Sequence, residues 1–306
     1  MSVVITGSAG IDTVETPVDR RERVMGGSAM YISAAASFFT PVALVSVVGE
    51  DWPRANTEIL RGRGVDTTAL EIRQGEKTLY WFGRYHGNMD ECETVEIQPN
   101  VFSADFIPAV PAKYRKGASV VLLGNASPTT QMALLDQVPS RALTLADTMN
   151  YYINGQRPAL ERLLKRIDVL VLNESELFLL TEENALVAAI EKALTLGPKV
   201  LVVKRGTCGV ILATAAGQKA ILPAYPMGRV VDPTGAGDSF LGGLGGSLAA
   251  VVGPGRLPSI EEWKSALLNA TLIASFCIES FSLERLLTLV QDEFRQRREE
   301  FVRMLP

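Results

Sequence analysis

Residues 230–240 have the clearest capacity for chemistry in this chain and read Val-Val-Asp-Pro-Thr-Gly-Ala-Gly-Asp-Ser-Phe. The pattern predicts a short apolar run that ends at Asp232, a turn of small residues, and a helix that begins near Asp238. The first backbone N–H groups of a helix have no partner within it and lie at the positive end of the helix dipole. A turn with so few bulky side chains therefore predicts a site that can hold an anion.

Asp238 stands at the mouth of this expected anion site. A carboxylate beside a phosphate is repulsive, so packing alone gives little reason for an aspartate there. Phosphoryl transfer gives a good reason, because the acceptor hydroxyl needs a base while the transferred group needs positive dipoles. The amides that would face the transferred group belong to Gly235, Ala236 and Gly237.

Two further polar segments follow predicted strands. Asn173 and Glu176 are three residues apart, so they share one face of the helix that begins there. An amide and a carboxylate suit a hydrated Mg²⁺, but the same pair also fits a capping box. The segment Lys204 to Gly209 could contact a phosphate or present a surface lysine, and it lacks the spacing of a Walker motif.

Near the N-terminus, Asp12 follows the first apolar strand, and Gly26 and Gly27 open a helix rich in small residues. A carboxylate at a strand end can accept hydrogen bonds from sugar hydroxyls, or it can cap a turn. Two glycines at a helix start allow a ligand to approach the backbone closely, and they equally allow close helix-to-sheet packing. Both alternatives stay open at each position.

Strand-like and helix-like segments alternate along most of the chain, which predicts an α/β fold with a mostly parallel sheet. The expected strands are near-continuous apolar runs, as in strands buried on both faces. They span about 2–7, 42–48, 119–124, 142–147, 168–172 and 200–204, with a hairpin at 209–214 and 218–223. Helices are expected near 27–39, 53–63, 129–137, 156–166, 184–196, 237–252, 260–279 and 283–301.

Two segments break this alternation. Residues 66–100 contain short β-like pieces without a helical period, and residues 11–25 are polar and extended. We expect both to form a small β lid over the substrate, because they leave from the carboxyl ends of sheet strands, where ligands bind in open α/β sheets. A sheet with open edges favours pairing with a second copy, so a homodimer through the lid is expected.

Composition narrows the classes of partner. The chain has 306 residues, a net charge of −4 and no basic tract, which disfavours nucleic acid and anionic membranes as partners. It shows neither a signal-peptide pattern nor a long apolar span, so we expect a cytoplasmic protein. Three cysteines without a CxxC pair give no support to a zinc or redox site. We expect one α/β domain over residues 1–306.

Taken in order, these segments resemble the ribokinase-like PfkB family of sugar and nucleoside kinases, over essentially the whole chain. The most specific match is the stretch from Asp232 to Asp238. The family's asparagine–x–x–glutamate motif matches Asn173 and Glu176, and its N-terminal double glycine matches Gly26 and Gly27. The resemblance implies a three-layer sandwich with a mostly parallel central sheet, a small β lid, and a kinase that uses ATP and Mg²⁺.

The resemblance also implies roles for single residues. Asp238 would be the general base, and Gly235 to Gly237 the anion hole. Asp12 would bind the substrate, and a glycine–x–aspartate motif falls on Gly49 and Asp51. The ATP would lie along Asn173, Lys204, Gly206, Gly209 and Asn269, Mg²⁺ would be held through water by Asn173 and Glu176, and a monovalent cation such as K⁺ by Asp232.

One departure concerns the acceptor. Sugar kinases of this family usually have an asparagine after the double glycine, and here the matching residue is Tyr31. An aromatic ring could stack on a base, which favours a nucleoside such as adenosine; alternatively Asn125, at the end of its strand, contacts a sugar. We expect a kinase that phosphorylates a primary hydroxyl of a small sugar or ribonucleoside. A non-catalytic sensor of a nucleotide or sugar is the alternative, and a dinucleotide oxidoreductase lacks its glycine fingerprint.

Overall fold

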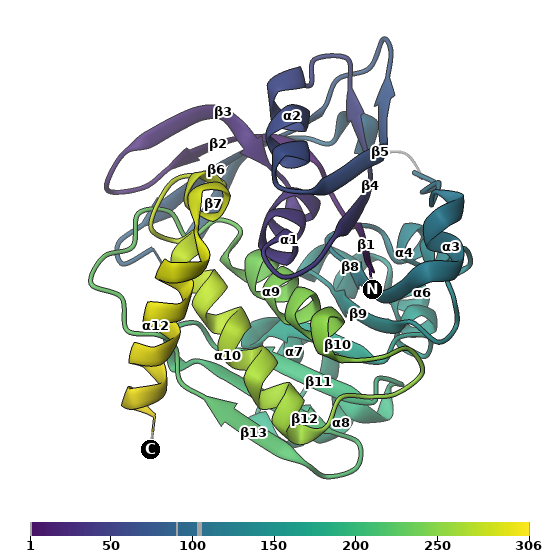
Figure 1. Ribbon diagram of the computed structural model, residues 1–306, viewed down its shortest axis with the longest axis vertical. Coiled ribbons are helices and arrows are strands. Elements are labelled where there is room, and N and C mark those ends of the chain that lie inside the picture. Colours follow the sequence, from purple (N-terminus) through teal and green to yellow (C-terminus); the bar gives the residue numbers. More distant parts are fainter. Residues whose placement is uncertain (1, 90, 103–105, 306) are drawn as a thin grey trace.

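The computed structural model describes residues 2–89, 91–102 and 106–305. A nine-stranded central sheet forms the middle layer, in the order β13-β12-β11-β10-β9-β8-β1-β4-β5 (Figure 1). In this sheet, β11, β10, β9, β8, β1, β4 and β5 run parallel to one another. The hairpin of β12 and β13 at the other edge pairs antiparallel. The strands are β1 (Ser2–Thr6), β4 (Val42–Gly49), β5 (Val65–Arg73), β8 (Ala118–Leu123), β9 (Leu143–Asp147), β10 (Val169–Asn173), β11 (Val200–Lys204), β12 (Val210–Thr214) and β13 (Lys219–Leu222).

Helices cover both faces of the central sheet, which confirms the expected α/β architecture. Alternate strand residues belong to two separate apolar cores, one on each face. The first core involves α1 (Ser28–Ser37), α2 (Arg54–Gly62), α9 (Ala236–Val251), α10 (Ile260–Cys277), α11 (Glu284–Thr288) and α12 (Gln291–Met304). The second involves α3 (Ala112–Gly117), α4 (Pro128–Leu135), α5 (Asn150–Gly155), α6 (Arg157–Leu164), α7 (Glu174–Thr181) and α8 (Leu186–Thr195).

A four-stranded lid sheet stands beside the central sheet, in the order β3-β2-β6-β7. Its strands are β2 (Gly10–Glu15), β3 (Arg20–Gly26), β6 (Leu79–His86) and β7 (Glu91–Gln98). The separate small sheet agrees with the two segments that break the sequence alternation. However, residues 66–73 of the expected lid belong to β5, which pairs with β4 in the central sheet. Residue 90, also within the expected lid, lies outside the described residues.

The C-terminal helix expected over 283–301 is instead two helices. α11 ends at Thr288, and the backbone is extended at Leu289 and Val290 before α12 begins. The amide of Val290 donates a hydrogen bond to the Glu293 carboxylate at 3.3 Å, so α12 has a start signal of its own. None of the helices in the described part of the chain is long and apolar enough to cross a membrane.

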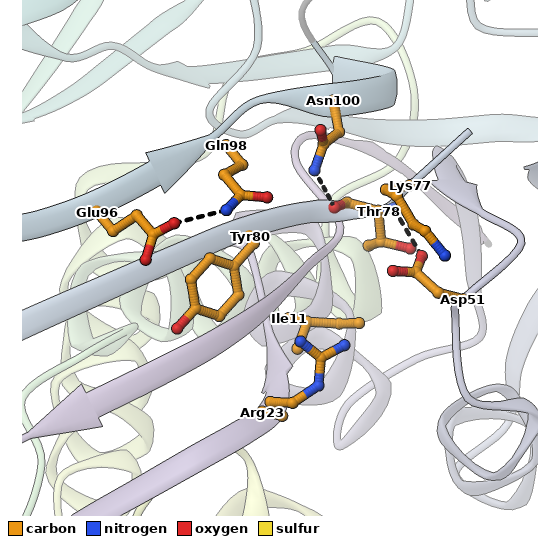
Figure 2. A pocket seen from close by; sticks show the side chains of 9 residues that line it. All are labelled: Ile11, Arg23, Asp51, Lys77, Thr78, Tyr80, Glu96, Gln98 and Asn100. Atoms are coloured by element: carbon orange, nitrogen blue, oxygen red, sulfur yellow. Dashed lines mark hydrogen bonds between the residues drawn. The ribbon is translucent and has the colours of Figure 1, made fainter.

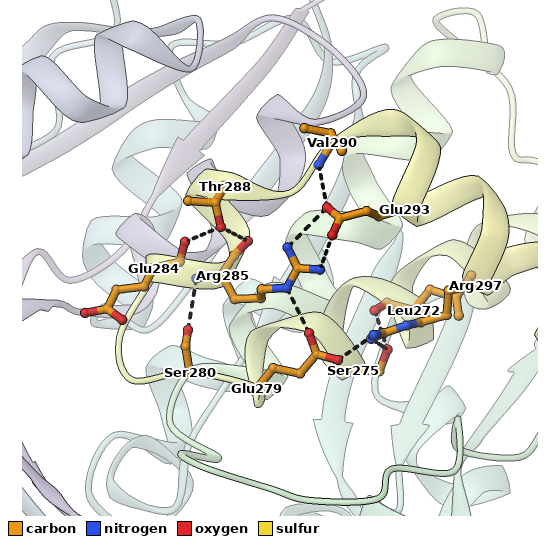
Figure 3. Close-up of polar contacts among 10 residues, drawn as sticks. All are labelled: Leu272, Ser275, Glu279, Ser280, Glu284, Arg285, Thr288, Val290, Glu293 and Arg297. Atoms are coloured by element: carbon orange, nitrogen blue, oxygen red, sulfur yellow. Dashed lines mark hydrogen bonds and ion pairs between the residues drawn. The ribbon is translucent and has the colours of Figure 1, made fainter.

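A charged network fastens α12 to the end of α10 (Figure 3). The Glu279 carboxylate accepts hydrogen bonds from Arg285, at 2.9 Å, and from Arg297. Arg285 also pairs with Glu293, and the Arg297 guanidinium lies 3.5 Å from the centroid of the Phe276 ring. Glu279 therefore holds two arginines from separate helices, and both of them are also in cation–π contact with Phe276.

Removing this carboxylate should be costly. We expect Glu279→Ala to lower the free energy of unfolding by about 2–4 kcal/mol, because two largely buried guanidinium groups lose their shared partner. Urea denaturation measures the change. The matched control is Asp292→Ala, whose ion pair with Arg295 is mostly exposed and should contribute less than about 0.5 kcal/mol. Equal losses in the two variants would contradict the assigned role of Glu279.

Candidate active site

Three polar side chains end neighbouring parallel strands: Asp147 on β9, Asn173 on β10 and Lys204 on β11. Side chains two residues apart in a strand point to the same face of a sheet. The residues two positions before them are Leu145, Val171 and Val202, and all three belong to the core shared with α1, α9 and α10. All three polar groups therefore face the layer that contains α9.

The anion site is predicted at the start of α9. Gly235 precedes the helix with a φ of 75°, a left-handed conformation that favours glycine. Asp232 shapes the turn, because its two carboxylate oxygens accept the amide hydrogens of Thr234, at 2.9 Å, and Ser282, at 3.2 Å. The residues from Gly235 to Asp238 all retain partial solvent exposure. The Ala236 amide donates to the Pro233 carbonyl at 3.2 Å within the turn. The start of α9 is thus partly open to solvent at its first residues.

Lys204 lies directly against this helix start. A β-carbon added at Gly237 would stand 2.8 Å from the Lys204 Nζ, closer than real contacts allow. The glycine leaves room for the ammonium group beside the backbone of α9, and a β-carbon there would push the end of the flexible lysine side chain aside. A lysine and a set of helix amides at one point form a site for a phosphate group.

Asp238, in the first turn of α9, is the carboxylate beside these donors. Burial raises its pKa to about 6, the Lys204 charge opposes that rise, and the Glu176 charge adds to it. The residue as a whole retains partial solvent exposure, although its carboxyl group is buried. A carboxylate with such a pKa is ionised at neutral pH and still a useful proton acceptor.

Asn173 and Glu176 form the capping box that the spacing allowed. The Asn173 Oδ1 accepts the Glu176 amide hydrogen, and the Glu176 Oε2 accepts the Asn173 amide hydrogen, both at 2.8 Å. Burial raises the pKa of Glu176, and Lys204 lowers it. In residues 2–89, 91–102 and 106–305, no three acidic, histidine or cysteine side chains gather closely enough to hold a metal alone. The donors fit a hydrated Mg²⁺, which takes few protein ligands.

Asp12 explains the first of the two glycines. A β-carbon at Gly26 would overlap the Asp12 Oδ2 at 1.8 Å, and the Gly27 amide hydrogen bonds to the same carboxylate. Burial raises the pKa of Asp12 to about 7; the Gly27 hydrogen bond lowers it, and the charges of Asp232 and Asp238 raise it. Asp12 is therefore close to the start of α9, although it lies on the lid strand β2.

Tyr31 differs from the expectation of a substrate contact. Only 2% of this residue is exposed, and a β-carbon at Gly235 would meet its ring at 2.3 Å. The ring packs against the turn that precedes α9, which leaves almost no surface for a ligand. We infer that Tyr31 supports Gly235. The alternative contact, Asn125, is partly exposed at the end of β8, and its Oδ1 is buried without a hydrogen-bond partner.

The remaining expected ATP contacts lie beyond β11 and on α10. Gly206 has a φ of 54° and open space around it, whereas Gly209 packs against the backbone of Leu222 and Pro223. The Asn269 Oδ1 accepts a hydrogen bond from the Arg298 Nε at 3.3 Å, so α12 borders this position. The geometry places Gly206 next to Lys204 and gives Gly209 a packing role in the hairpin.

The lid contacts the start of α9. The Tyr85 hydroxyl on β6 is 3.1 Å from the Thr234 Oγ1. Trp81 is the direct strand neighbour of Asp12, so both side chains face the same way. The indole lies across Gly83, where a β-carbon would meet the ring at 2.0 Å, and its Nε1 donates to the Thr94 Oγ1 at 3.2 Å.

A cavity of about 470 Å³ lies beside the first residues of β2 and β6, on the face of the lid sheet opposite to Asp12 and Trp81 (Figure 2). Ile11 and Tyr80 line it, whereas their chain neighbours Asp12 and Trp81 point to the opposite side of the lid sheet. Asp51 accepts the amide hydrogen of Thr78 at 2.7 Å and so fastens the segment before β6 to the end of β4. The cavity is therefore separated from the start of α9 by the lid.

Sequence reasoning missed Asp147, Trp81 and Tyr85. Asp147 ends a predicted strand, as Asn173 and Lys204 do, so its position carried the same signal. Trp81 and Tyr85 lie two strand pleats apart within the segment expected to form the lid. The alternation of β6 would have placed them on one face, but only the pairing with β2 shows which face that is.

The raised pKa of Asp12 predicts a pH-dependent effect on stability. The folded-state pKa is about 7 and the ordinary value is 3.8, so burying the charged form destabilises the protein increasingly as the pH rises through this range. We expect Asp12→Asn to raise the melting temperature at pH 8 and to change it little at pH 4. Calorimetry at both pH values measures this, with the exposed Asp136→Asn as control. A gain at pH 8 no larger than at pH 4 would contradict it.

Comparisons with known proteins show the family and the fold of this chain. The family model described as "pfkB family carbohydrate kinase" matches residues 2–287. A cytidine kinase from Thermococcus kodakarensis is 28% identical over 252 residues, which cover 80% of this chain and 87% of that protein. The nucleoside kinase of Burkholderia thailandensis, solved with inosine, superimposes with a TM-score of 0.79 at 17% identity, covering 99% and 100% of the two chains. A putative ribokinase II from E. coli, solved with ATP and Mg²⁺, gives 0.76 at 19% identity, covering 98% and 99%.

Proposed function

Because this chain belongs to the pfkB family of carbohydrate kinases, we propose that it transfers the γ-phosphate of ATP to a primary hydroxyl, with a ribonucleoside as the favoured acceptor. Its general activity, phosphate transfer to a hydroxyl of a sugar or nucleoside, follows from the family. The observation that carries the proposal is Asp238 beside Lys204 at the accessible start of α9. The non-catalytic alternative gains no support, because these groups are present together.

In the proposed mechanism, Asp238 accepts the proton of the attacking hydroxyl. The amides of Gly235, Ala236 and Gly237 and the ammonium of Lys204 stabilise the charge on the transferred group. Asn173 and Glu176 would hold Mg²⁺ through water, and a bound Mg²⁺ would neutralise phosphate charge. The E. coli structure with ATP and Mg²⁺ supports this cofactor pair. We propose K⁺ only as a further occupant near Asp232, whose carboxylate already organises the turn.

The lid supports a nucleoside as the acceptor. Asp12 would bind ribose hydroxyls. Trp81, its partner on the neighbouring strand β6, would offer an aromatic face for the base. A cytidine kinase and a nucleoside kinase solved with inosine are among the relatives, which favours the same class. Trp81 therefore takes the stacking role that the sequence suggested for Tyr31.

We also propose that two copies associate through the lid, and that the protein acts in the cytoplasm. Strand β7 forms an open edge of the lid sheet, and all its residues are exposed. An open edge presents unpaired backbone groups to a partner.

The first test concerns Asp238. We expect Asp238→Asn to lower kcat by about 10²–10⁴-fold, because the acceptor loses its proton acceptor, while ATP binding changes little. ADP release over a panel of nucleosides and sugars measures turnover, and calorimetry measures ATP binding. Asp136→Asn, an exposed aspartate, serves as control. A kcat close to that of the unmodified enzyme would remove Asp238 from the chemistry.

The second test concerns Trp81. We expect Trp81→Leu to raise KM for cytidine or inosine by about 5- to 100-fold, the range of one lost stacking contact, and to leave KM for ribose nearly unchanged. Trp81→Phe, which keeps an aromatic face, should retain most of the affinity. Equal changes for nucleosides and ribose would show that Trp81 acts on the lid as a whole and not on a base.

A further inference from the structure

The cavity beside the first residues of β2 and β6 has the size of a small-molecule site, and the lid separates it from the proposed active site. Its volume of about 470 Å³ is within the range of ligand pockets, which is about 300–1,000 Å³. Ile11 and the Tyr80 ring supply apolar surface, and polar or charged side chains make up the rest of the lining. An apolar floor with a few convergent polar groups is typical of a binding pocket.

Arg23 brings a charge without a partner to this cavity. Figure 2 shows its side chain pointing from β3 toward the other lining residues. The other three arginines of the lid strands, Arg20, Arg21 and Arg84, each pair with a carboxylate. The Arg23 guanidinium has neither an ion pair nor a hydrogen bond within the described part of the chain, and the residue is exposed. Its donors are therefore open to a ligand.

The backbone of β3 directs Arg23 to this place. The residue has a φ of 52°, a left-handed conformation that is uncommon outside glycine. The pairing of β3 with β2 shifts its register here, between Asp12 and Val14, and a bulge of this kind re-aims a side chain. The Thr13 Oγ1 accepts hydrogen bonds from the Arg23 amide at 3.3 Å and from the Tyr80 hydroxyl at 3.0 Å, which fixes the bulge against β6.

The two carboxylates of the lining already have partners. Asp51 accepts the Thr78 amide hydrogen at 2.7 Å, and Glu96 accepts a hydrogen from the Gln98 Nε2 at 2.5 Å. A planar guanidinium with open donors matches two oxygens of a phosphate or carboxylate. The group that would complete this cavity is therefore an anion.

We propose that the cavity is a regulatory site for a small sugar phosphate. Arg23 would hold the phosphate through two hydrogen bonds, and Lys77, the second cation of the lining, would offset its second charge. Phosphate is favoured over a single carboxylate because two cations suit a dianion. Glu96 and Gln98 would bond to the hydroxyl groups, and the Tyr80 ring would cover the sugar.

The cavity is back to back with the residues proposed to bind the acceptor. Ile11 and Asp12 are adjacent in β2, as Tyr80 and Trp81 are in β6, and adjacent strand residues face opposite sides. Asp51 adds the segment after β4 to the same wall. A ligand there would touch both the lid and the end of the central sheet, so it would favour one position of the lid. The inference goes beyond the proposed function, which needs no second ligand.

The binding test uses ribose 5-phosphate as the probe, and calorimetry with the intact protein measures its dissociation constant. We expect Arg23→Ala to raise this constant by about 10- to 100-fold, the range of one lost charge-assisted contact. The matched control is Arg20→Ala, on the same strand, because Arg20 already pairs with Glu15 and Glu22. This control should leave the constant unchanged. No measurable binding to the unmodified protein, or an equal constant in Arg23→Ala, would overturn the inference.

A kinetic test separates this cavity from the acceptor site, which could also bind the probe. We expect ribose 5-phosphate to lower KM for cytidine or inosine by about 5-fold or more, because the cavity is present where the lid contacts the start of α9. In Arg23→Ala this decrease should vanish, whereas turnover without the probe should match the unmodified enzyme. A rise in KM that is equal in both proteins would mean competition at the acceptor site and would overturn the inference. If neither nucleoside is phosphorylated, the proposed acceptor is wrong, and calorimetry still decides the role of the cavity.

Discussion

The approach of Lys204 to the bare start of α9 is the contact on which the rest of the site depends. The glycine at position 237 leaves room for this contact, because a β-carbon there would shift the ammonium group. This contact also requires nearby negative charge, because a partly buried ammonium group beside helix amides concentrates positive charge. Asp238 and Glu176 provide that compensation, and their pKa values respond to Lys204. In the proposed mechanism, binding of a phosphate and activation of a hydroxyl would both follow from this one charge arrangement.

The turn before α9 is stabilised by contacts from the core on one side and from the lid on the other. Tyr31 packs beneath Gly235, and Asp232 accepts two backbone amides that fix the path of the chain before α9. From the lid, Tyr85 lies within hydrogen-bond distance of Thr234. The lid thus contacts the turn that carries the anion-binding amides. A substrate held between Asp12 and this turn would touch both parts at once, which is the arrangement expected of a lid that excludes water.

The sequence was sufficient for the fold class because buried parallel strands are apolar throughout, and because Asp232 to Asp238 is a specific motif. The pairing of Asn173 with Glu176 was also predictable, since their three-residue spacing allowed a capping box as one of two alternatives. Tyr31 could not be placed, because burial depends on α9, which lies about 200 residues further along the chain. Asp147 ends a predicted strand, as Asn173 and Lys204 do, but the lack of a partner for its carboxylate oxygen is visible only in the folded structure.

Burial raises the pKa of four aspartates near the start of α9, namely Asp12, Asp147, Asp232 and Asp238. Each is an acidic group whose charged form is disfavoured by the fold, so together they lower the stability of the protein at neutral pH. Stability alone would not favour placing four such groups close together, and the single ammonium group of Lys204 cannot neutralise all of them. Groups of this kind are retained where a ligand supplies the missing partner, and they make stability depend on that ligand. The unbalanced charge is therefore the physical link between the architecture and the cation-dependent chemistry proposed for it.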